Sequence, residues 1–241
     1  MIRGAVIALL VAGAALAQTA PGASLLAPLD SPAAMPPPPW REVLLPKQTL
    51  PRTRFTRVEL DGQVALRVES PGSYGNLVHP LAQPVDPKAQ LSWRWRLDQA
   101  IEGADLQRKG GDDAALKVCV LMDAPLDGIP FAERQQLRLA RWLSGEPLPS
   151  ATLCYVWDRS LPAGSVLPNA YTHRVRWMVL QGRDSPLGRW QDERRTLRAD
   201  VLAAFGDELR ELPPISAVLV GADADNSGGH GRGYLAVLDL R

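Results

Sequence analysis

The densest group of side chains that could do chemistry lies between Gly221 and His230. Asp223 and Asp225 can bring hard carboxylate oxygens to one cation, and Asn226 follows them directly. The stretch begins like an EF-hand loop, but Tyr234 stands where a bidentate glutamate is required, which excludes that motif. A cation site, with calcium as the candidate ion, and a plain turn both remain open, because hairpin loops need the same residue types.

Two further polar groups are candidates for ligand binding. Asp112 and Asp113 precede a β-rich run, where adjacent carboxylates can hold a cation or a sugar hydroxyl, although a solvated loop has the same composition. The run Tyr155–Asp158 ends a predicted strand with an aromatic ring and an acid. We therefore take seven residues as candidate ligand-binding positions: Asp112, Asp113, Trp157, Asp158, Asn169, Trp190 and Glu193.

Glu193 belongs to a run rich in charge that extends from Gly188 to Arg195. In a strand, Glu193 and Arg195 would share one face, and Trp190 would point to the other. Glu193 is then either part of a structural ion pair or one half of a hydrolytic carboxylate pair, with Asp112 or Asp158 as the second half. No residue is assigned a catalytic role.

Several enzyme classes lack their sequence signatures in this chain. There is no P-loop, G-x-G-x-x-G, G-x-S-x-G or H-E-x-x-H motif. The three histidines, His79, His173 and His230, are far apart and have no zinc spacing. The net charge is +1, which argues against a nucleic-acid partner because such proteins carry a basic field.

Short strands must position these side chains. Alternation of apolar and polar residues predicts strands over 54–60, 63–69 and 91–97, and runs rich in strand-forming residues predict strands over 115–122, 152–157, 173–180, 216–220 and 234–240. Helical spacing predicts two helices, over 131–143 and 198–205. Many strands without regular strand–helix alternation predict a mainly β fold, an antiparallel jelly-roll β-sandwich of galactose-binding-like type with two short helical insertions.

The N-terminus predicts export. Residues 1–17 carry Arg3, an apolar run and an A-x-A cleavage signal, so we expect a removed signal peptide and a periplasmic or secreted protein with no transmembrane segment after cleavage. Residues 18–39 are rich in Ala and Pro and predict a disordered tether. Residues 40–241 are expected to form a single β-sandwich domain.

Cys119 and Cys154 are the two cysteines of the chain. An even count in an oxidising compartment favours a disulfide, and both residues lie mid-strand by pattern. Two unpaired thiols in the core are the alternative.

The ordered series of motifs from about Trp40 to the C-terminus resembles an exported bacterial family known as a domain of unknown function, number 3047. The segments that carry the resemblance are Leu91–Trp95, Gly111–Ala115, Leu139–Arg141, Ser144–Glu146, Tyr155–Trp157, Gly188–Trp190, Glu193–Arg194, Ala204–Gly206 and Asp223–Gly228. The resemblance implies a secreted β-sandwich similar to galactose-binding-like and carbohydrate-binding jelly rolls, without an established reaction. The two cysteines and Thr196-Leu197 depart from the usual pattern, in which Asn-Val is more typical after the Glu-Arg-Arg run.

These observations favour a non-catalytic binding domain for a glycan or another cell-envelope polymer, with calcium as a candidate structural ion. A hydrolase of envelope polysaccharides that uses a carboxylate pair is one alternative. A structural or assembly protein of the envelope, in which the seven Trp residues form core or partner contacts, is the other.

Overall fold

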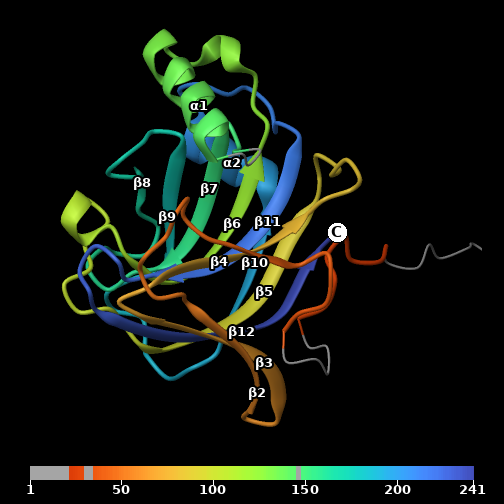
Figure 1. The fold of residues 1–241 in the computed structure, drawn as a ribbon. Helices are drawn as coiled ribbons and strands as arrows, with labels where there is room; N and C mark the ends of the chain where they lie inside the picture. Colours follow the sequence, from red (N-terminus) through yellow and green to blue (C-terminus); the bar gives the residue numbers. More distant parts are fainter. Residues whose placement is uncertain (1–21, 30–34, 145–147) are drawn as a thin grey trace, which may run out of the picture.

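The computed structural model describes residues 22–29, 35–144 and 148–241. They form two packed β-sheets with two short α-helices at one end (Figure 1). The fold is therefore a mainly β jelly-roll sandwich, as the sequence predicts. The predicted signal peptide, residues 1–17, lies outside the described residues.

The larger sheet has seven strands in the order β1-β4-β11-β6-β7-β9-β8. Their bounds are β1 Arg41–Val43, β4 Tyr74–Pro80, β11 Ile215–Asp223, β6 Ala114–Met122, β7 Ala151–Trp157, β9 Val175–Gln181 and β8 Val166–Pro168. All neighbours pair antiparallel except β7 and β9, which run parallel.

The smaller sheet has five antiparallel strands in the order β10-β5-β12-β3-β2. Their bounds are β10 Gln191–Thr196, β5 Gln90–Gln99, β12 His230–Leu240, β3 Gln63–Pro71 and β2 Arg54–Leu60. The helices are α1 Phe131–Ser144 and α2 Leu197–Phe205, and two single 3-10 turns, η1 Lys109–Gly111 and η2 Leu126–Gly128, flank β6.

The core fills the space between the two sheets. Every second residue of β5, from Leu91 to Leu97, is at most 2% exposed, because a strand directs alternate side chains to one face. Trp95 packs against Trp157 of the opposite sheet, with 5.7 Å between ring centroids, and Trp93 packs against Tyr155 at 5.2 Å. Burial of these large rings is the main favourable term for the sandwich.

The predicted strands and helices are present, with small changes at their ends. The β2–β3 hairpin turns at Asp61 and Gly62, whose φ angles of 51° and 73° are those of the tight turn that an Asp-Gly pair forms. The predicted strands do not include β1, β4, β8 and β10. Strand β4 lacks an apolar alternation because Gly75 and Asn76 interrupt it.

The prediction of a disordered tether over 18–39 is wrong for residues 22–29. Leu26 and Leu29 are only 5% exposed because their apolar side chains pack into the core. The Ala- and Pro-rich composition of the segment does not indicate this packing. The amide of Leu25 donates to the carbonyl of Leu240 at 2.9 Å, and Trp40 Nε1 donates to Ala27 O at 2.8 Å. This segment is part of the folded domain.

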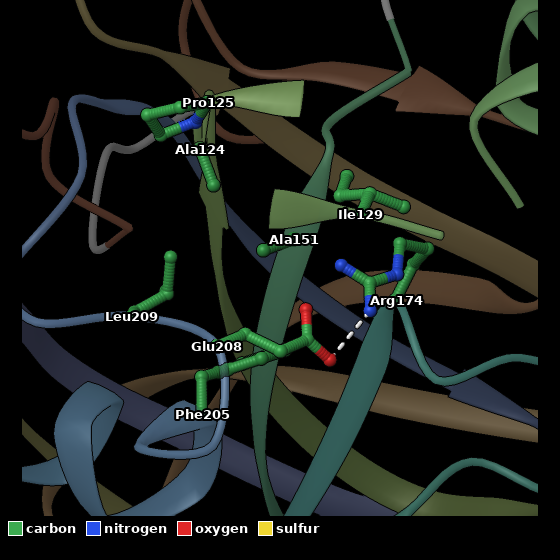
Figure 2. Close-up of a pocket in the computed structure, with 8 residues that line it drawn as sticks. All are labelled: Ala124, Pro125, Ile129, Ala151, Arg174, Phe205, Glu208 and Leu209. Carbon is green, nitrogen blue, oxygen red and sulfur yellow. Dashed lines mark hydrogen bonds and ion pairs between the residues drawn. The ribbon is translucent and has the colours of Figure 1, made fainter. Parts of the chain in front are cut away.

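The helices lie at one end of the sandwich, with α1 at the top of Figure 1. Arg174 binds Glu133 of α1 and Glu208, which follows α2, and thereby ties both to the sheet. The cavity beside Arg174 measures about 10 Å³, the size of a single water, so this region is closed (Figure 2). Within the described part of the chain, no helix has the length and apolarity that a bilayer span requires.

Candidate functional site

A cleft of about 570 Å³ lies on the outer face of the seven-stranded sheet. Its floor is formed by β4, β11, β6, β7 and β9. Along these strands, the side chains that face the cleft alternate with side chains that face the core between the sheets. The apolar part of the floor comprises Val78, Cys119, Leu121, Cys154, Val175, Trp177 and Leu219. Polar side chains gather at one end, where η1, the start of β4 and the end of β11 meet.

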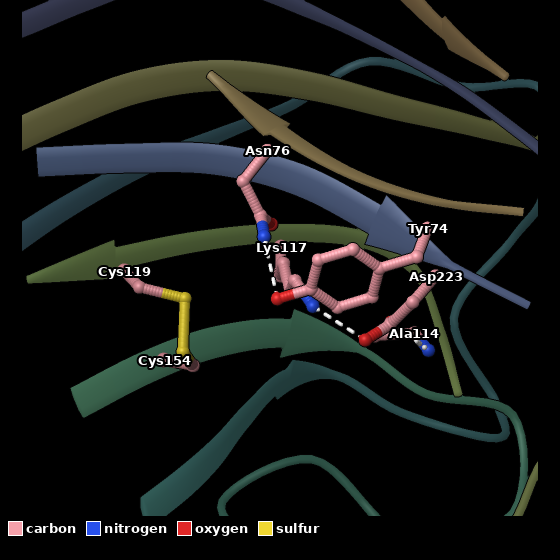
Figure 3. Close-up of a disulfide and its surroundings, with 7 residues drawn as sticks. All are labelled: Tyr74, Asn76, Ala114, Lys117, Cys119, Cys154 and Asp223. Atoms are coloured by element: carbon pink, nitrogen blue, oxygen red, sulfur yellow. Dashed lines mark hydrogen bonds and ion pairs between the residues drawn. A yellow bond between two sulfur atoms is a disulfide. The ribbon is translucent and has the colours of Figure 1, made fainter. Parts of the chain in front are cut away.

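A buried ion pair lies at this polar end (Figure 3). Lys117 Nζ is 2.7 Å from Asp223 Oδ2, and the side chains are only 7% and 10% exposed. Asp223 Oδ1 accepts the amide of Ala114 at 2.9 Å, because β11 and β6 pair at these residues. Burial acts to lower the pKa of Lys117, but Asp223 and Tyr74 outweigh it and the pKa is raised, so Lys117 is an ammonium.

Aromatic rings flank this ammonium group. Lys117 Nζ lies 5.7 Å from the ring centroid of Tyr74 and 5.9 Å from that of Trp177. Tyr74 accepts a hydrogen bond from Asn76 Nδ2 at 2.9 Å, and burial raises the pKa of Tyr74, so the phenol is neutral. The charge of Lys117 is thus held by one carboxylate and two rings.

Asp112 is the second buried carboxyl group of the cleft, at 6% exposure. Its Oδ2 accepts a hydrogen bond from Asn169 Nδ2. Burial raises the pKa of Asp112 to about 6; Asn169 opposes this shift, and the nearby charge of Asp223 adds to it. The pKa of Asp225 is also raised, first by burial and then by Asp223.

Three buried polar atoms that line the cleft have no hydrogen-bond partner among the described residues: Asp112 Oδ1, Asn76 Oδ1 and Trp177 Nε1. Asn76 lies against Gly221, where the Cβ of any other residue would collide with its amide. All three atoms have almost no accessible surface, so they belong to the wall of the cleft, where the Trp177 side chain lies against the Asp112 carboxyl group and opposes the rise of its pKa.

Six of the ten predicted site residues come together at the polar end of the cleft. Asp112, Asn169, Asp223, Asp225 and Asn226 line the cleft. Asp113 lies beside them, where it accepts the amides of Asn226 at 3.0 Å and Ser227 at 2.7 Å.

The other four lie elsewhere. Trp157 packs in the core, and Asp158 accepts the amide of Leu161 in a local turn at 2.6 Å. Trp190 lies on the outer face of the smaller sheet, where its Nε1 donates to Asp61 at 3.0 Å. The predicted site residues therefore do not form one cluster.

Glu193 makes neither of the two predicted pairings. It accepts hydrogen bonds from Trp95 Nε1 at 3.1 Å and Gln181 Nε2 at 2.8 Å, and no ion pair with a described residue is present. It does not line the cleft with Asp112, and Asp158 is occupied by its own turn. Glu193 and Arg195 share one face of β10, as expected, because each pairs with a residue of β5 that points into the core.

Pattern analysis did not single out Tyr74, Asn76, Lys117 or Trp177. The sequence does indicate that Lys117 is unusual, since it is the one charged residue in the otherwise apolar strand Ala114–Met122. A charge in such a strand requires a buried partner. Tyr74 and Asn76 belong to β4, which the sequence did not reveal.

Cys119 and Cys154 form a disulfide on the floor of the cleft (Figure 3). They are directly paired residues of β6 and β7, with 4.0 Å between their Cα atoms. The bond fixes two floor strands side by side.

Calcium binding stays a prediction. Asp223 is engaged by Lys117, and Asn226 Nδ2 donates to Asp113 at 3.2 Å. In the described ranges, no three His, Cys, Asp or Glu residues are grouped to hold a metal. A thermal melt with and without calcium tests the prediction, because an ion that binds the folded state raises its melting temperature.

Comparison with known proteins identifies the family. The model of the family described as "Protein of unknown function (DUF3047)" matches residues 38–238. The chain belongs to this family. No curated protein matches the DUF3047 chain.

Solved structures with a similar jelly-roll fold include a family 12 xyloglucanase from Bacillus licheniformis, with a TM-score of 0.43, 12% identity, and coverage of 80% of this chain and 88% of that chain. The catalytic domain of Humicola grisea Cel12A, in complex with a thio cellotetraose, has a TM-score of 0.42, 12% identity, and coverage of 84% and 92%. The xyloglucanase domain of NopAA from Sinorhizobium fredii, in complex with cellobiose, has a TM-score of 0.38, 6% identity, and coverage of 84% and 97%.

Proposed function

We propose that this DUF3047 protein is an exported, non-catalytic module that binds a glycan or another polyhydroxylated envelope polymer in the cleft. The observation that carries the proposal is the cleft itself, in which polar side chains at one end, those of Asn169, Asp225 and Asn226 among them, lie beside an apolar floor. Sugars match this combination, since their hydroxyl groups both donate and accept while their C–H faces are apolar. The volume of about 570 Å³ lies within the usual range of ligand pockets.

Export is supported by the sequence of residues 1–17, which has the charge, apolar run and cleavage signal of a secretory leader. An exported protein meets the polysaccharides of the envelope. Detection of the chain in periplasmic or culture-medium fractions, with Gln18 as the mature N-terminus, tests this part of the proposal.

Titration calorimetry against soluble oligosaccharides of envelope polymers tests the binding itself. Trp177→Phe keeps an aromatic side chain but reduces the ring surface that lines the cleft, so affinity is expected to fall about fivefold, which corresponds to about 1 kcal/mol of lost apolar contact. Trp190→Phe is the matched control, because Trp190 lies outside the cleft. Absence of binding to every oligosaccharide, or equal effects of the two variants, would contradict the proposal.

One observation favours a catalytic alternative, a hydrolase of the same polymers. The pKa of Asp112 is raised to about 6 by burial, which is the range of a general acid that protonates a glycosidic oxygen. Release of reducing ends by the wild-type protein and its loss in Asp112→Asn would establish catalysis. Binding without release, in both proteins, supports the non-catalytic module.

A further inference from the structure

A second cavity, of about 390 Å³, lies on the outer face of the larger sheet next to the cleft. The two spaces adjoin, because they share the lining residues Val43, Val78, Leu121, Leu148 and Pro149. Each is on its own within the size range of a pocket for one small ligand. We call the cleft and the second cavity together the groove.

The groove follows the strands of its floor. Every second residue of β4 from Tyr74 to Pro80 lines it, and so does every second residue from Lys117 on β6 to Asp123, which directly follows that strand. Alternate residues of a strand point to the same face, so one continuous sheet surface carries both cavities. The distance from Lys117 to Asp123 is roughly 20 Å, at about 3.3 Å per residue of a strand.

The chemistry of the lining changes along this length. Asp225 and Asn226 line the cleft at its polar end, and Arg41, Asp123 and Ser216 line the second cavity. Between these polar groups lie the five shared residues, all of which are apolar. A ligand that contacts the whole groove therefore has polar groups at both ends and an apolar face between them.

The floor strands offer side chains rather than a free strand edge. Strands β4, β11 and β6 each pair with a neighbour on both sides, so their backbone groups are used within the sheet. An extended peptide that binds by adding a strand needs an exposed edge. A chain that binds through hydroxyl groups and apolar C–H faces has no such requirement.

We propose that the groove holds an extended segment of a linear glycan that is longer than a disaccharide and lies along β4 and β6, from the polar end of the cleft to Asp123. This inference rests on the proposed glycan-binding function and specifies the length and direction of the ligand. Val43 of β1 and Leu148 and Pro149, which precede β7, flank the floor strands in the order of the sheet. They contact the middle of the bound chain.

The length of the ligand is tested on the wild-type protein. Titration calorimetry compares the dimer, tetramer and hexamer of two backbones, β-1,4-linked N-acetylglucosamine and β-1,4-linked glucose. Affinity for the backbone that binds is expected to rise about tenfold from dimer to tetramer, because each further unit buries more of its apolar face on the floor.

A variant at the far end tests the direction. Ser216 on β11 lines the second cavity and not the cleft, so Ser216→Trp fills part of the second cavity. This variant should bind the tetramer about tenfold more weakly than the wild-type protein does, whereas its affinity for the dimer should be unchanged and shows that the protein is folded. Thr56→Trp is the matched control, because Thr56 on β2 of the smaller sheet lies outside the groove, and it should change neither affinity.

Three results would overturn the extended site while glycan binding in the cleft stands. These are equal affinities of the wild-type protein for dimer and tetramer, an unchanged tetramer affinity in Ser216→Trp, and an equal loss of dimer and tetramer affinity in that variant. If no oligomer of either backbone binds and a wider glycan panel also fails, the proposed function is overturned and the extended site with it.

Discussion

Among the described residues, one lysine and one arginine are buried, and their surroundings differ. Lys117 in the cleft is 5% exposed, and Arg174 beneath the helices is 9% exposed. Arg174 Nε is 2.9 Å from Glu133, and its Nη2 is 2.6 Å from Glu208, in a region whose cavity is about 10 Å³ (Figure 2). Lys117 has one carboxylate partner and stands beside an open cleft of about 570 Å³.

The comparison separates a structural ion pair from a binding site. Glu133 and Glu208 both form ion pairs with Arg174, and the cavity beside it has room for no more than a water molecule. Around Lys117, polar side chains and an apolar floor line an open cleft. Burial of charge alone therefore does not mark function, whereas a buried charge beside an open cleft does.

The largest effect is expected from Asp223→Asn. The change leaves the ammonium of Lys117 buried without a counter-ion, which should lower the free energy of unfolding by about 3–5 kcal/mol. Urea denaturation at neutral pH measures it. The double variant Lys117→Met/Asp223→Leu is the control and should recover much of the loss, because two apolar side chains leave no unpaired charge. A loss below about 1 kcal/mol in the single variant would show that water reaches Lys117.

Removal of the disulfide should have the next largest effect. Cys119 and Cys154 are 35 residues apart, and a closed loop of this length contributes about 3–4 kcal/mol in the chain-entropy model. The variant Cys119→Ala/Cys154→Ala, compared with the wild-type protein under oxidising and reducing conditions, measures this contribution. Identical denaturation midpoints for the reduced and oxidised wild-type protein would contradict it.

Asp112 should make stability depend on pH in the direction opposite to that of a salt-bridged acid. Its pKa is about 6 in the folded protein and near 4 in the unfolded chain, so the folded state binds the proton more tightly. The resulting stabilisation is complete below about pH 4 and is lost as the pH rises through about 6, by up to about 3 kcal/mol. Denaturation of wild type and Asp112→Asn across this range should show a larger loss in the wild-type protein, because Asp225 and Glu193, whose pKa values are also raised, titrate in both.

The smallest effect is expected from Arg174→Met. Both glutamate partners are partly exposed and can be rehydrated, so the free energy of unfolding should fall by about 2 kcal/mol, less than for Asp223→Asn. Ligand affinity should not change, because Arg174 does not line the cleft. Reduced affinity in this variant, measured by calorimetry, would show that the helices and the cleft are coupled.

The sequence predicts the core better than the cleft, for a physical reason. Strand β5 alternates strictly between apolar and polar residues, so its inward face can be read directly. Strand β7 is buried along its whole length, with one face in the core and the other in the floor of the cleft, and no alternation is visible. Trp157 on β7 was therefore predicted at a rim although it points into the core, while Trp177, which faces the cleft, was not singled out.

The assembly of the site depends on strand order, which local patterns do not contain. Asp112 and Asp223 are more than one hundred residues apart and meet because β11 lies between β4 and β6. The polar loop 221–230 could be recognised by composition, but its partner Lys117 could be identified only through the pairing of β11 with β6. Sequence analysis thus found one side of the charge cluster and missed the other.

The position of β12 has a consequence for biosynthesis. This last strand of the described chain lies at the centre of the smaller sheet, between β5 and β3, and the nearly last strand β11 lies within the larger one. Neither sheet can complete its strand order until β11 and β12 have been synthesised, and such long-range pairings form slowly. Until then, the edges of β3 and β5 that pair with β12 have no partner in the smaller sheet.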